Sequence, residues 1–137
     1  MTTVESKTVS IEAPAEKLFN YLSNFNNFQH LMPPQVTQWK STTDSCSFNI
    51  QGMADIELNI QEKIPFQLIK MNASGTTPVG LFMTWNFIEN RNLTDVRLVL
   101  DADLNPVMAM MAKAPLNNFV NLLVDKLKEL AEKGNIL

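Results

Sequence analysis

The stretch that decides the fold is VSIEAPAEKLF, residues 9–19. Its first five residues alternate between apolar and polar side chains, and this period of two predicts a strand with one buried face. Pro14 follows at once and suits the first position of a helix, where its missing N–H group costs nothing. Leu18 and Phe19 would then lie on the inward side of that helix. The chain is therefore expected to begin with a strand over Glu5 to Ala13 that runs directly into a short helix.

A second short helical segment is expected around Phe28 to Met32, and it must end before Pro33 because the residue preceding a proline is pushed out of the helical region. From Gln35 onward the period of two returns, interrupted by turn signals such as Gly52. Six further strands are predicted at Val36 to Ser41, Cys46 to Gln51, Ala54 to Ile64, Phe66 to Ala73, Leu81 to Glu89 and Thr94 to Leu104. Their short connections predict antiparallel pairing, because a parallel crossover needs about a dozen residues or more.

The last segment, from about Pro106 to Gly134, predicts one long amphipathic helix with Asn105 as its N-cap. Apolar residues recur at helical spacing and form one stripe: Leu116, Phe119, Val120, Leu123, Leu127 and Leu130. Pro115 removes one backbone hydrogen bond, so the part before it is expected to be a separate or kinked segment. The predicted fold is α+β: a curved seven-stranded antiparallel sheet wrapped around a long C-terminal helix, with two short helices between the first and second strands.

Composition narrows the class of protein. A chain of 137 residues suits one domain, here residues 1–137. No uninterrupted apolar run approaches the roughly 18 residues of a transmembrane helix, so membrane insertion is not expected. The N-terminus carries no secretory signal pattern, which favours a cytoplasmic location. The net charge is −3 and the 11 basic residues are scattered, so no nucleic-acid partner is indicated.

Cys46 and His30 are the sole cysteine and the sole histidine. They do not make a ligand set for a structural zinc ion, so no metal and no cofactor is predicted.

The order of elements, with the APAEKLFNYLSN helix at residues 13–24, resembles the SRPBCC or START-like superfamily. The most specific match is the strand that runs into Ala-Pro-Ala at residues 13–15, and the Leu-Asn-Pro sequence at residues 104–106 adds weaker support. The resemblance covers essentially the whole chain. It implies a helix-grip fold with a cavity between sheet and helix, and superfamily members include lipid-transfer and polyketide cyclase/dehydrase-like proteins.

A cavity of this kind favours a bound hydrophobic small molecule or lipid as the partner. The inward positions of three strands and of the last helix are its predicted lining: Ile56, Leu58, Ile60, Met83, Trp85, Leu98, Met108, Met111, Phe119 and Leu123. Thioethers make an adaptable lining for a ligand of irregular shape, although methionines equally serve as core filler. Trp85 is a cavity candidate because its indole N–H needs a partner once it is buried.

Two alternatives to binding stay open at this level. A polyketide cyclase/dehydrase-like enzyme needs an acid or base, and Glu62 is the weak candidate because strict alternation places it on the face of Ile60. A bulge near the strand end would turn Glu62 to solvent. His30 lacks a partner close in sequence and is interpreted as a surface histidine, and no nucleophile motif occurs. The other alternative is a structural or dimerising module whose core is filled by its own side chains.

Overall fold

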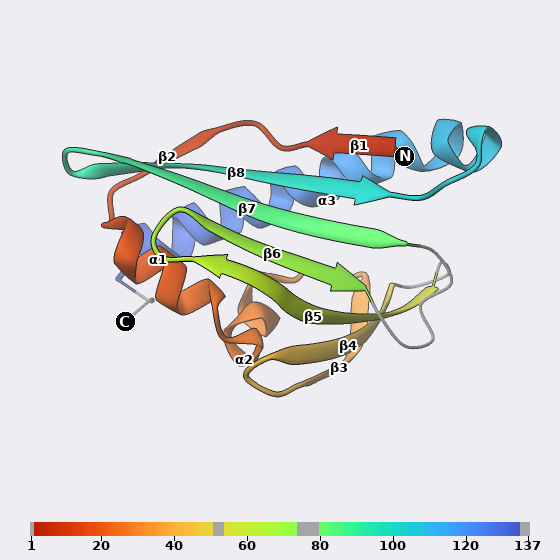
Figure 1. Ribbon diagram of the computed structural model, residues 1–137, viewed down its shortest axis with the longest axis horizontal. Coiled ribbons are helices and arrows are strands. Elements are labelled where there is room, and N and C mark those ends of the chain that lie inside the picture. The colour runs from red at the N-terminus through yellow and green to blue at the C-terminus, as the bar shows by residue number, and fades with distance from the viewer. Residues whose placement is uncertain (1, 51–53, 74–79, 135–137) are drawn as a thin grey trace.

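A curved antiparallel sheet wraps around one long helix in the computed structural model, which describes residues 2–50, 54–73 and 80–134 (Figure 1). The strands are β1 Thr2–Glu5, β2 Val9–Ile11, β3 Val36–Ser41, β4 Ser45–Ile50, β5 Ala54–Ile64, β6 Leu68–Ala73, β7 Leu81–Asn90 and β8 Leu93–Ala102. The helices are α1 Ala15–Leu22, α2 Phe25–Phe28, the 3₁₀ helix η1 Gln29–Leu31 and α3 Pro106–Glu132. The strand order is β1-β8-β7-β6-β5-β4-β3, and β2 also pairs with β8. This architecture confirms the predicted α+β helix-grip fold.

The N-terminal segment forms two strands where one was predicted, so the described sheet has eight strands and not seven. The break lies at Ser6. Its backbone N–H still donates to the Leu98 carbonyl at 2.8 Å, but the Leu98 N–H donates to the Ser6 hydroxyl oxygen at 2.9 Å. A side chain thus replaces a backbone acceptor, and the register shifts by one residue between the Glu5–Val99 and Val9–Val96 pairs.

Several element boundaries differ from the sequence prediction by one or more residues, among them both ends of β8, and three of the differences have a local cause. Pro14 is the N-cap of α1 and not its first helical residue. The second helix starts earlier than predicted because the Asn24 side chain accepts a hydrogen bond from the Asn26 N–H at 2.9 Å and caps α2. Strand β6 starts later because Phe66 adopts a left-handed φ of 63° in a turn closed by the Gln67 N–H and the Ile64 carbonyl.

The part of α3 from Asn117 onward packs against the rest of the molecule. Its apolar stripe is buried at Val120, Leu123, Val124 and Leu127. Three hydrogen bonds tie this part to the N-terminal strands and their connection. The Asn117 amide donates to the Glu5 carbonyl at 3.1 Å, the Lys7 N–H donates to the Asn121 amide oxygen at 2.8 Å, and the Lys128 ammonium donates to the Ser10 carbonyl at 2.6 Å.

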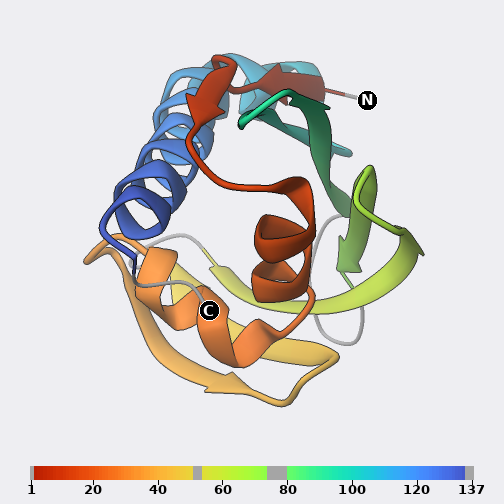
Figure 2. The ribbon, with the colours of Figure 1, turned by 90° about the vertical axis from the view of Figure 1, so that its left-hand side faces the viewer.

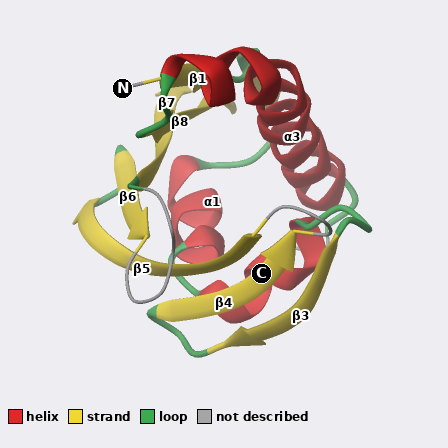
Figure 3. Cartoon of the chain, turned by 90° about the vertical axis from the view of Figure 1, so that its right-hand side faces the viewer, coloured by secondary structure: helices red, strands yellow, loops and turns green. Residues whose placement is uncertain are grey.

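The N-terminal half of α3 is much more exposed. Val107 is 67% exposed and Met110 is 84% exposed, although both are apolar. Pro115 does not split the helix in two, because helical structure is continuous from Pro106 to Glu132. The first turns nevertheless run across the top of the molecule before the helix turns downward (Figure 3), which agrees with the kinked form of the prediction.

By length and composition, α3 is apolar enough to cross a membrane. The sequence analysis expected no such segment, because it looked for an uninterrupted apolar run; the average hydropathy of α3 stays high even though asparagines interrupt it. In the structure α3 is the core helix of the fold, and it packs against β1, β2 and β8.

The short helices cover one end of the sheet (Figure 2). Their aromatic side chains contact those of β7. The ring centroids of Phe28 and Trp85 lie 6.0 Å apart, those of Phe19 and Phe87 lie 6.3 Å apart, and both pairs are edge-on. This end of the sheet is therefore filled by side chains.

The packing of α3 can be tested by truncating one side chain of its stripe. We expect Leu127→Ala to lower the free energy of unfolding by about 2 to 5 kcal/mol, because Leu127 is fully buried and its removal leaves a cavity. Leu122→Ala is the matched control, since Leu122 lies on the same helix and is 47% exposed. Urea denaturation measures the free energy of unfolding, and the control should lower it by less than about 1 kcal/mol. Equal effects of the two substitutions would mean that the stripe is not buried as described.

Candidate ligand-binding site

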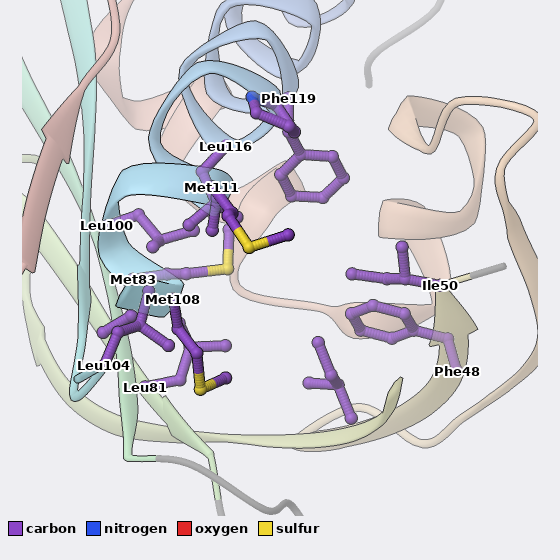
Figure 4. Close-up of a pocket in the computed structure, with 14 residues that line it drawn as sticks. Phe48, Ile50, Leu81, Met83, Leu100, Leu104, Met108, Met111, Leu116 and Phe119 are labelled. Carbon is purple, nitrogen blue, oxygen red and sulfur yellow. The ribbon is translucent and has the colours of Figure 1, made fainter. Parts of the chain in front are cut away.

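An apolar cavity of about 410 Å³ lies under the N-terminal half of α3. Its walls come from β4, β5, β7, β8, the segment after β8, and α3, and Figure 4 shows their side chains converging on one space. The lining residues are Phe48, Ile50, Ile56, Leu81, Met83, Leu100, Ala102, Leu104, Met108, Met111, Ala112, Pro115, Leu116 and Phe119. The cavity occupies the end of the concave face that α1 and α2 leave uncovered.

The chemistry of this lining is uniform, because every side chain in it is apolar. Such a wall removes apolar ligand surface from water, which contributes about 25 cal/mol per Å². Among the described residues it supplies no side chain that could transfer a proton or hold an ion. Met108 and Met111 lie on the solvent side, where they are 45% and 76% exposed, so the cavity reaches the surface along α3.

The structure brings five of the ten predicted lining residues together around this cavity. They are Ile56 on β5, Met83 on β7, and Met108, Met111 and Phe119 on α3. The methionines therefore lie at the cavity and do not serve only as core filler there. Their flexible thioethers can adapt the wall to ligands of different shape.

The other five predicted residues do not line this cavity. Leu58, Trp85, Leu98 and Leu123 are fully buried in the core, and Ile60 packs against that core. Trp85 shows why these residues miss the cavity. It lies on the same face of β7 as Met83, but two residues further along, where Phe28 covers the strand. The prediction assumed that the buried indole N–H needs a partner at the cavity, but it has no hydrogen-bond partner within the described chain.

Sequence reasoning missed nine lining residues. Leu81, Leu100 and Ala102 belong to the same alternating faces that identified Met83 and Leu98, so the pattern itself contained them. The missing information was the point along each strand where the covering helices stop. The other six lining residues were missed for a different reason, because their strand or helix pattern does not indicate which element they face. Two of them are Phe48 and Ile50 on β4, and four lie in or just before α3. Those four are Leu104, Ala112, Pro115 and Leu116.

The polar candidates lie elsewhere. Glu62 is exposed beside an irregularity in the β5–β6 register and is not part of the lining. His30 is exposed on η1. Cys46 is buried, and burial raises the pKa of its thiol to about 12, so the thiol stays protonated at neutral pH and is a poor nucleophile. Within the described ranges, no three metal-ligating side chains gather.

Solved structures resemble this chain over nearly its full length. A START superfamily protein from Mycobacterium smegmatis aligns with a TM-score of 0.76 at 16% identity, covering 97% of this chain and 99% of that protein. XoxI from Bacillus cereus aligns with a TM-score of 0.75 at 13% identity, covering 96% of each chain. The Aha1 dimer from Colwellia psychrerythraea aligns with a TM-score of 0.72 at 18% identity, covering 98% of each chain.

No protein-family model and no curated protein sequence matches this chain. At identities this low the structural likeness establishes the fold, and it confirms the resemblance that the N-terminal motif indicated. Ligand-binding modules are common on this fold, but function has to be argued from the site itself. The chain thus has the START-like helix-grip fold, with an apolar cavity at one end of its sheet.

Filling the cavity should abolish binding of an apolar probe. We expect Ala112→Trp to weaken binding of the neutral dye N-phenyl-1-naphthylamine by more than about tenfold, because the indole would occupy the space that the dye needs. Ala114→Trp is the matched control, since Ala114 lies on the same helix, is exposed and does not line the cavity. Fluorescence titration gives affinity and stoichiometry, and circular dichroism checks the fold. Equal binding by both variants would show that the dye binds elsewhere.

Proposed function

We propose that this protein binds a hydrophobic small molecule or lipid in the cavity between the sheet and α3. The observation that supports this function best is the cavity wall, which is apolar throughout and encloses about 410 Å³. Sites for small molecules typically enclose roughly 300 to 1,000 Å³ and are lined mainly by apolar side chains. A ligand here would gain burial of its own surface and would cover apolar lining that water otherwise contacts.

The composition of the wall favours binding over catalysis. A cyclase or dehydrase needs convergent acid and base groups near the reacting atoms. The described lining offers none, and Glu62 lies outside it. The volume of the cavity likewise favours binding over the filled-core alternative.

Access to the cavity would be controlled by the first turns of α3. Met108 and Met111 form part of the wall and face solvent. Among the described residues, the hydrogen bonds that tie α3 to the N-terminal strands all start at or after Asn117. Pro115 removes a further bond within the helix, because it has no N–H for the carbonyl four residues earlier. The part before Pro115 can therefore open while the part after it stays in place.

Native mass spectrometry of the purified protein tests the function directly. We expect the wild type to carry an added mass of an apolar molecule that is released on denaturation, and Ala112→Trp to be purified without it, because the cavity is then filled. The control Ala114→Trp should retain the added mass. The proposal would be contradicted if the purified wild type carried no such molecule and also bound no apolar probe after organic solvent had been used to strip any ligand from it.

Hydrogen exchange tests the role of the first turns of α3. In the ligand-free protein we expect amides 110–114 to exchange at least about tenfold faster than amides 123–130, because low packing and a missing hydrogen bond permit local opening. Adding a saturating apolar probe should slow exchange in the first range and leave the second unchanged. Equally slow exchange in both ranges without ligand would show that the first turns are ordinary core.

A further inference from the structure

A second pocket adjoins the apolar cavity and has a different chemistry. It encloses about 310 Å³, and its lining residues are Pro33, Gln35, Val36, Ile50, Pro115, Leu116, Asn118, Phe119 and Leu122. Four of these residues, Ile50, Pro115, Leu116 and Phe119, also line the apolar cavity, so the two spaces adjoin there. In Figure 4 the Phe119 ring projects from α3 toward the space beside Ile50.

The polar side chains of this second pocket are two uncharged amides, Gln35 and Asn118. No Asp, Glu, Lys, Arg or His of the described chain lines either pocket. An amide offers both a donor and an acceptor, so it can pair with a hydroxyl, an amide or an ester. It cannot neutralise the charge of a carboxylate or an ammonium group.

The asparagines of α3 show that Asn118 differs from its neighbours. Asn117 donates to the Glu5 carbonyl, and Asn121 accepts from the Lys7 N–H, so both amides serve the fold. The side chains of Asn118 and Gln35 make no hydrogen bond to another described residue. Both line the second pocket and both are exposed, so water can occupy their donors and acceptors until a ligand displaces it.

We propose that the two pockets together hold one amphipathic molecule with an uncharged polar head. Its apolar body fills the cavity under Met108, and its head pairs with Gln35 and Asn118 beyond the Phe119 ring. This inference rests on the proposed binding function and adds the class of ligand: a molecule whose head carries an amide, hydroxyl or ester. A carboxylate or ammonium head loses part of its hydration there without gaining an opposite charge.

Three ligands with the same ten-carbon chain and different heads distinguish neutral from charged head groups: decanamide, decanoate and decylammonium. The affinity of each is measured by its displacement of N-phenyl-1-naphthylamine at pH 7. We expect decanamide to bind the wild type about fivefold more tightly than either ion, which corresponds to about 1 kcal/mol, typical of one neutral hydrogen bond. The double variant Gln35→Leu with Asn118→Leu removes both amides at similar side-chain volume and should abolish that preference. The measured quantity is the ratio of affinities, which a general loss of stability does not change.

The control is Gln29→Leu, because Gln29 is exposed on η1 and lines neither pocket. It should keep the wild-type ratio. Equal affinity for the three ligands, a preference for an ion, or an unchanged ratio in the double variant would overturn this inference while dye binding still supported an apolar cavity. Failure of the dye and of all three ligands to bind would instead refute the binding function itself.

Discussion

The uneven attachment of α3 is the constraint on which the rest of the structure depends. From Asn117 onward the helix buries Leu123 and Leu127 and is tied by hydrogen bonds to β1, β2 and their connection. Before Asn117 it makes no such hydrogen bond among the described residues, and Met110 is exposed. If both parts packed equally, the sheet would be filled along its whole length and no cavity would exist. The site is thus a consequence of where the helix leaves the sheet.

The cavity also depends on how the concave face is divided. Along β7, Leu81 and Met83 face the cavity, whereas Trp85 and Phe87 face the aromatic side chains of the short helices. One alternating pattern therefore serves both stability and binding. The aromatic end supplies close packing, and the opposite end keeps apolar surface available to a ligand.

Much of this could be predicted from sequence, because period and turn signals act locally. The alternation along β7 identified its inward face, and the Asn105-Pro106 pair located the start of α3. The split of the first strand could not be predicted, since it depends on the Ser6 hydroxyl meeting the Leu98 N–H across the sheet. The division of the inward face was also beyond the sequence, because it depends on how far α1 and α2 reach over strands that follow them in the chain.

The most direct test of this account is NMR of the protein with ¹³C-labelled methionine methyl groups, titrated with a neutral apolar ligand. Met83, Met108 and Met111 line the cavity, whereas Met110 is 84% exposed on α3, lines neither pocket and serves as an internal control. The account predicts large shifts for the three cavity methyl groups at one equivalent of ligand and at most a small shift for Met110. A shift of Met110 with the cavity methyl groups unchanged would contradict it.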